Sequence, residues 1–148
     1  MLNIKIVNII GMILVFLGLA MIPSSFWSLS SASEYKYANH EFFDFIAILK
    51  SSAITILCGF ILYISTLYQK NRNKKVLKAR DGFVIVTLGW ILMAIFSSLP
   101  FYFSYTSLSF TNSFFESMSG LTTTGASILG SSTTPQIENL SKGLLFWR

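Results

Sequence analysis

Long uncharged stretches limit what this chain can fold into more than any other feature. Between residues 6 and 22 every side chain is apolar or glycine except Asn8, and residues 42–68 and 82–105 are mostly apolar as well. Charged residues make up 11% of the 148, whereas soluble domains carry about 25%. A chain so poor in charge cannot hide its apolar surface by folding on itself. The sequence therefore predicts an all-α polytopic membrane protein.

The first two stretches are predicted to form a leading pair of transmembrane helices within residues 1–69. Each is long enough to cross a hydrocarbon core of about 30 Å. Gly11 and Gly18 lie seven residues apart, so they share a helix face and allow another helix to approach closely. A signal peptide is the alternative for the first stretch, with Lys5 at its basic end and residues 31–33 as cleavage site, although signal sequences have shorter apolar regions.

Basic residues gather in one loop, residues 70–81. The loop holds six of them: Lys70, Arg72, Lys74, Lys75, Lys78 and Arg80. The positive-inside rule makes this loop and the N-terminus cytoplasmic, so the third helix, 82–105, runs outward. Asp81 is its expected N-cap, and Pro100 is expected to bend or end it. Such a cluster is typical of a membrane loop, so lipid is the expected surrounding and no nucleic-acid partner is expected.

Groups that could carry enzyme chemistry are sparse. Cys58 is the only cysteine and His40 the only histidine, which excludes an internal disulfide and a cysteine metal site. No acid–base pair has catalytic spacing, so the chain is not expected to be an enzyme. Lys50 lies inside the second apolar stretch. It is expected to reach the headgroups or to pair with Asp44, with a role in transport as the alternative.

A short amphipathic segment follows the third helix. Asn112 or Ser113 can cap a helix over residues 112–121, Ser113 and Glu116 have the spacing of a capping box, and Gly120 can stop the helix. A helix of this length is too short to span a bilayer. It has the size of a re-entrant helix that enters from the outer face, with residues 122–130 returning.

The returning segment begins with TTTGAS, residues 122–127. Three β-branched threonines, Thr122 to Thr124, favour an extended strip, and Gly125 can adopt the positive φ that aligns successive carbonyls. Backbone carbonyls aimed at a pore axis can replace the water of a dehydrated potassium ion, as in the TVGYG filters of potassium channels. A plain turn is the alternative, because glycine and threonine are common in loops.

Four motifs resemble the TrkH family of potassium-uptake proteins, within the TrkH/KtrB/KdpA superfamily. They are LKARDGF at 77–83, LPF at 99–101, FFESMSGLTTTGA at 114–126 and GLLFWR at 143–148. The resemblance implies four joined helix–pore loop–helix units around one pseudo-fourfold pore. Residues 82–148 would be the first unit, with outer helix 82–105, pore helix 112–121, filter 122–127 and an incomplete second helix 141–148.

The same resemblance implies the site residues. Thr123, Thr124, Gly125 and Ala126 would bind the transported potassium through backbone oxygens, with Thr123 and Thr124 as the principal ligands. Thr122, Ser127 and Glu116 would support the filter. No other cofactor is expected. The family also implies the bacterial inner membrane, a homodimer and a cytosolic nucleotide-binding regulator of the TrkA type.

The length suggests that the chain is a piece of a longer transporter. One strip of carbonyls surrounds an ion on one side only, so the chain alone is not expected to conduct. Two alternatives stay open: a minimal homotetrameric channel, and a small membrane protein that transports nothing and has a structural or interaction role.

Overall fold

A computed structural model describes residues 4–31, 38–67, 77–130, 134–137 and 140–148, which form helices joined by loops and contain no strand. The helices are α1 (Ile4–Ser31), α2 (Ala38–Leu67), α3 (Ala79–Phe103), α4 (Phe110–Leu121) and α5 (Lys142–Trp147). The predicted helical class is therefore confirmed for this part of the chain.

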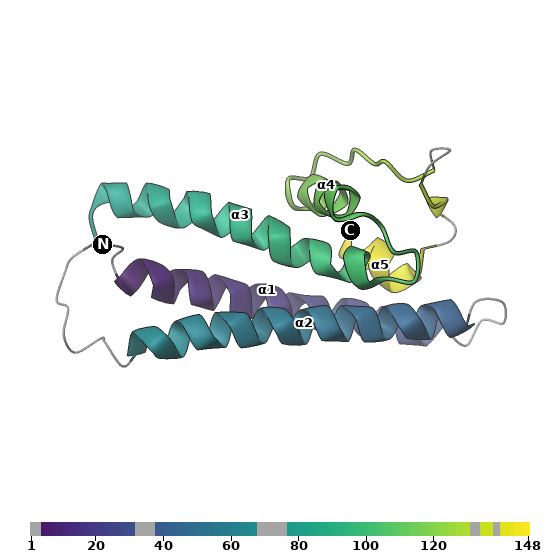
Figure 1. The fold of residues 1–148 in the computed structure, drawn as a ribbon, viewed down its shortest axis with the longest axis horizontal. Coiled ribbons are helices and arrows are strands. Elements are labelled where there is room, and N and C mark those ends of the chain that lie inside the picture. Colours follow the sequence, from purple (N-terminus) through teal and green to yellow (C-terminus); the bar gives the residue numbers. More distant parts are fainter. Residues whose placement is uncertain (1–3, 32–37, 68–76, 131–133, 138–139) are drawn as a thin grey trace.

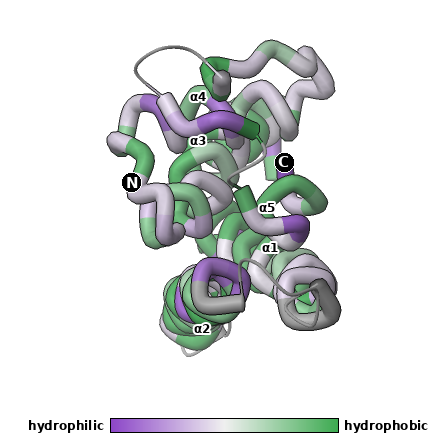
Figure 2. The backbone as a smooth tube through the Cα atoms, turned by 90° about the vertical axis from the view of Figure 1, so that its right-hand side faces the viewer, coloured by the Kyte–Doolittle hydropathy of each residue, from purple (hydrophilic) through white to green (hydrophobic). Residues whose placement is uncertain are grey.

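Three helices are long and apolar enough to cross a membrane, over Ile4–Ser28, His40–Thr66 and Ala79–Phe103. Figure 1 shows α1 and α2 side by side with α3 crossing them, and it places α4 and α5 at the end where α2 begins and α3 ends. Figure 2 views the bundle from one end and shows many apolar residues along the long helices. Large apolar side chains such as Phe16, Ile61 and Phe83 are exposed, as expected of surfaces that face lipid.

The leading pair packs through glycine, as the spacing of Gly11 and Gly18 predicted. A Cβ on Gly11 would lie 2.8 Å from the carbonyl oxygen of Gly59, and a Cβ on Gly59 would lie 2.7 Å from that of Gly11. Two side-chain hydrogen bonds join the same helices: Ser52 Oγ donates to the Gly18 carbonyl at 2.8 Å, and Asn8 Nδ2 donates to Thr66 Oγ1 at 2.7 Å. The small residues thus let the backbones of α1 and α2 approach closely, and this close approach lets polar groups of the two helices form hydrogen bonds.

Gly59→Ala is expected to destabilise the α1–α2 pair by about 1–3 kcal/mol, because the added methyl meets backbone atoms that cannot turn away. The midpoint of heat-induced unfolding in detergent measures this loss. Gly82→Ala is the matched control, since beyond the neighbouring residues of its own helix no described atom lies within 4 Å of its Cβ position, and alanine is the better helix former. Equal midpoints for the two variants would contradict the packing described here.

Both prolines of the long helices lie inside helices. α1 continues eight residues past Pro23, and α3 continues three residues past Pro100, where it was expected to bend or end. The predicted N-cap of α3 is wrong: Lys78 holds that position, and Asp81 accepts the Lys78 backbone N–H at 3.1 Å from within the first turn.

A proline has no backbone N–H to donate to the carbonyl four residues earlier, so Pro100 leaves a gap in the hydrogen bonds of α3. Near that gap in α3, Trp147 Nε1 donates to the carbonyl of Ser97 at 3.0 Å.

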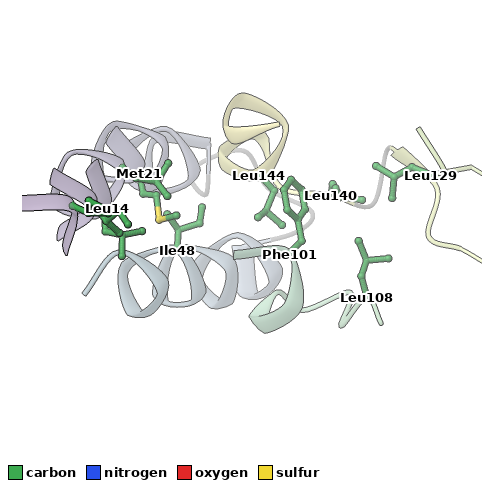
Figure 3. Close-up of a cluster of buried hydrophobic side chains, with 11 residues drawn as sticks. Leu14, Met21, Ile48, Phe101, Leu108, Leu129, Leu140 and Leu144 are labelled. Carbon is green, nitrogen blue, oxygen red and sulfur yellow. The ribbon is translucent and has the colours of Figure 1, made fainter. Parts of the chain in front are cut away.

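One apolar cluster links the bundle to the segments that follow it. Leu14 and Met21 of α1, Ile48 of α2, Phe101 of α3 and Leu144 of α5 are all buried (Figure 3). Leu108, Leu129 and Leu140 continue this cluster into the loops on either side of α4 and α5 (Figure 3). The loop after α4 is therefore anchored to the bundle by an apolar side chain.

Lys50 and Asp44 of α2 each contact residues of other segments instead of each other. Lys50 Nζ lies 4.3 Å from the centre of the Phe103 ring, a cation–π contact. Asp44 is 1% exposed, and it accepts the backbone N–H of Tyr105 at 2.7 Å and hydrogen bonds from the backbone and hydroxyl of Ser141. The suggested pairing of Lys50 with Asp44 is therefore replaced by contacts of each residue with the ends of other helices.

Candidate functional site

The short helix α4 begins earlier than predicted. Its N-cap is Ser109, whose hydroxyl accepts the backbone N–H of Asn112 at 3.3 Å, so neither Asn112 nor Ser113 caps it. The capping box of Ser113 and Glu116 is wrong for the same reason, because both residues lie inside the helix. The Ser113 hydroxyl donates instead to the carbonyl of Leu108.

The C-terminal end of α4 is a Schellman motif. The N–H of Thr124 donates to the Ser119 carbonyl and the N–H of Thr123 to the Gly120 carbonyl, each at 3.0 Å. Thr123 therefore lies in the left-handed region at φ 54°, where glycine is usual and a β-branched residue is strained. The expected extended strip over Thr122 to Thr124 is thus wrong at Thr123, and it is wrong at Thr122 as well, since this C-cap residue has φ −89° and ψ 3°. Gly120 does not stop the helix either, since α4 runs one residue beyond it.

Gly125 also has positive φ, 73°, and apart from its two chain neighbours no heavy atom of the described residues lies within 4 Å of the position that a Cβ would take. Two left-handed residues, 123 and 125, therefore alternate with Thr124 in the predicted filter. Within the described residues no donor bonds to the carbonyl oxygens of Thr123, Thr124 or Gly125. The carbonyl of Ala126 differs, because it accepts the Ser119 hydroxyl at 2.6 Å.

The threonine side chains bond to the segment itself. Thr122 Oγ1 donates to the Met118 carbonyl at 2.7 Å, and it lies 2.8 Å from Thr124 Oγ1. Residues 122–127 are all exposed. The segment therefore has hydroxyls that fix its own shape and an open side that this chain leaves uncovered.

Glu116 holds the far end of the segment from behind. It is 0% exposed, and its Oε1 accepts both the hydroxyl of Ser127 and the backbone N–H of Ile128, each at 2.8 Å. Its Oε2 lies 2.9 Å from Arg148 Nε. The carboxylate thus joins α4, the end of the predicted filter and the residue after α5. A buried carboxylate is stable only with such partners.

A turn follows the predicted filter. Gly130 has φ 85°, and its N–H donates to the Pro135 carbonyl at 2.9 Å, while the Thr134 hydroxyl donates to the Ile128 carbonyl. In Figure 1 the trace after α4 runs back toward the end of the bundle where α2 begins. The segment 122–130 is therefore supported at both ends: by the cap of α4 at its start, and by Glu116, Leu129 and this turn at its finish.

Sequence reasoning did not identify two residues of the site, Ser119 and Arg148. Ser119 bonds to Ala126 and Arg148 to Glu116, contacts that span seven and thirty-two positions. A charged arginine directly after the apolar stretch GLLFW is the one sequence signal that could have indicated a buried acidic partner. Nothing comparable marks Ser119.

Comparison with known proteins gives a family match over most of the chain. The TrkH family, described as cation transport protein, matches residues 47–148. The Trk system potassium uptake protein TrkH of Halomonas elongata is 34% identical over 145 residues, which are 97% of this chain and 26% of that protein. The TrkH protein of Escherichia coli K12 is 44% identical over 86 residues, 57% of this chain and 17% of that protein.

A third relative is the Trk system potassium uptake protein TrkI of Halomonas elongata, 39% identical over 105 residues, which are 71% of this chain and 20% of that protein. The chain thus spans about a quarter or less of the length of these relatives. No solved structure matches it.

Proposed function

The chain belongs to the TrkH family of cation transport proteins, and from that premise we propose that it supplies the first pore unit of a potassium-uptake protein. In this proposal α3 is the outer helix, α4 the pore helix, 122–127 one quarter of the selectivity filter and α5 the start of the second helix. Three further units would complete a pseudo-fourfold pore. The relatives that cover most of this chain are named as potassium uptake proteins, which supports the substrate.

The observation that carries the proposal is a set of three carbonyls, on Thr123, Thr124 and Gly125, to which no donor of the described residues bonds. Left-handed φ at 123 and 125 sets the direction of these oxygens, and the segment that bears them lies directly after the C-terminal end of α4. That end carries the partial negative charge of a helix dipole, which favours a cation. Thr123 and Thr124 are the proposed principal ligands. Because its oxygen already accepts a bond from Ser119, Ala126 contributes less in this scheme.

The surroundings follow from the same proposal. The basic loop between α2 and α3 lies mostly outside the described residues, and the positive-inside rule would make it cytoplasmic together with the N-terminus. Residues 104–109 and the start of α2 would then lie at the outer face of a bacterial inner membrane. A homodimer and a cytosolic TrkA-type regulator are proposed as partners of the complete protein.

The test expresses the complete open reading frame of the gene in a strain without its own potassium-uptake systems. We expect growth at low potassium and saturable uptake of rubidium, a potassium tracer, that excess potassium inhibits and equal sodium does not. The empty vector gives the background. Tagged protein present in the membrane without uptake above that background would contradict the proposal and favour a structural role.

A further inference from the structure

The carboxylate of Glu116 contacts three partners with its two oxygens. Oε1 holds Ser127 and Ile128, while Oε2 has the Arg148 guanidinium 2.9 Å away. No hydrogen-bond donor with good geometry reaches Oε2 from the described residues, so Arg148 acts on it as a nearby charge. The Glu116 side chain is 0% exposed and the Arg148 side chain 21% exposed, so little water screens the attraction between their charges.

Arg148 is itself placed by two helices. Its carbonyl oxygen lies against Gly120, where an added Cβ would overlap it, so the backbone after α5 touches α4 one turn beyond Glu116. The neighbouring Trp147 bonds to the Ser97 carbonyl of α3, near Pro100, and Leu144 is buried in the apolar cluster. The position of the guanidinium thus depends on how α5 lies against α3 and α4.

We propose that Arg148 is a positioning residue for the ion-binding segment: through Glu116, it makes the geometry of residues 123–127 depend on the placement of the second helix. This inference rests on the proposed function. Removing the guanidinium would leave a buried carboxylate without a compensating charge. That carboxylate would regain solvation by moving, and the hydrogen bonds from Ser127 and Ile128 would move or break with it. The segment would then offer potassium a poorer set of oxygens without any ligand being changed.

The experiment measures the KM and Vmax of rubidium uptake, and the amount of protein in the membrane, for variants of the complete open reading frame. Arg148→Gln is expected to raise KM about tenfold, the change that corresponds to about 1.4 kcal/mol of lost binding. Arg148→Lys keeps the charge and is expected to restore most of the affinity. Arg80→Gln is the matched control, because Arg80 is exposed in the first turn of α3, far along the chain from the site.

The double variant Glu116→Gln with Arg148→Gln isolates the coupling. Because it removes both charges, its KM is expected to be no higher than that of Arg148→Gln alone, whereas independent residues would multiply their separate effects. A KM for Arg148→Gln equal to the wild type, or fully multiplicative effects, overturns the inference.

Two further outcomes also test the inference: a variant that does not accumulate, and a wild type without uptake. If Arg148→Gln does not accumulate in the membrane, accumulation of the double variant supports the coupling, and its absence contradicts it. A wild type without rubidium uptake would remove the proposed function and this inference with it. An active wild type with an insensitive Arg148→Gln would remove the inference alone.

Discussion

Gly125→Asp is expected to reduce potassium-dependent growth and rubidium uptake to the level of the empty vector. The Cβ of an aspartate at 125 would point to the open side of the segment, where the described part of the chain places no heavy atom within 4 Å except those of residues 124 and 126. In the proposed pore that space belongs to the ion and to the other filter strips. A carboxylate there would bind the dehydrated cation too tightly for release, since conduction requires binding weak enough to leave.

Gly130→Asp is the matched control for this prediction. Gly130 also has positive φ, 85°, and its Cβ position makes only an ordinary 3.7 Å contact with Gln136. Both substitutions place an aspartate in left-handed backbone, which aspartate tolerates better than most residues. We expect the Gly130 variant to keep most of its uptake. Loss of uptake in both variants, or in neither, would contradict the assignment of residues 122–127 as the filter.

The membrane-spanning part of this fold could be predicted because its cause is local. Apolar stretches of sufficient length form helices in lipid whatever their partners, since only hydrogen bonds within a helix satisfy the backbone there. The shared face of Gly11 and Gly18 likewise required only helical periodicity. The identity of the facing residue, Gly59, could not be predicted, because it depends on the register of two helices.

Errors in the prediction arose where a local pattern competed with distant partners. Ser113 and Glu116 have the spacing of a capping box, but Glu116 instead accepts hydrogen bonds from residues 127 and 128 and forms an ion pair with Arg148. The spacing alone cannot show that this carboxylate is buried. The prediction of Asp81 as an N-cap was wrong because α3 begins three residues earlier than expected. The Asp81 carboxylate therefore stabilises the first turn from inside the helix.

The predicted filter shows the same competition within one segment. Three β-branched threonines favour extended backbone, yet the free carbonyls at the end of α4 require donors, and the N–H groups of residues 122 to 124 supply them. Meeting that requirement turns Thr123 left-handed at a cost of about 1–2 kcal/mol. Strain retained at a proposed ion-binding residue is common at functional sites, where the surrounding structure holds it. The sequence indicated which residues form the segment but not its backbone conformation.

The second large effect is expected at Asp44, the buried carboxylate of α2 that joins the ends of three helices. It accepts the N–H of Tyr105, just after α3, and both donors of Ser141, the N-cap of α5. Asp44 is only 1% exposed, so the site is buried. Asp44→Ala would therefore leave these donors without an acceptor and without water to replace it. We expect a loss of about 3 kcal/mol or more, because hydrogen bonds to a charged group contribute about 1.5–3 kcal/mol each.

Lower accumulation in the membrane and a lower unfolding midpoint in detergent would measure the loss at Asp44. Asp44→Asn keeps one acceptor oxygen of the same shape, so its midpoint should fall between those of Asp44→Ala and the wild type. Ser51→Ala is the control on the same helix, since the buried Ser51 hydroxyl donates only to the Ala47 carbonyl one turn away. If Asp44→Ala were no less stable than Ser51→Ala, the carboxylate would not be what holds α3 and α5 to α2. The position of α5, and with it that of Arg148, would then depend on the buried Leu144, on the hydrogen bond from Trp147 to Ser97 and on the ion pair of Arg148 with Glu116.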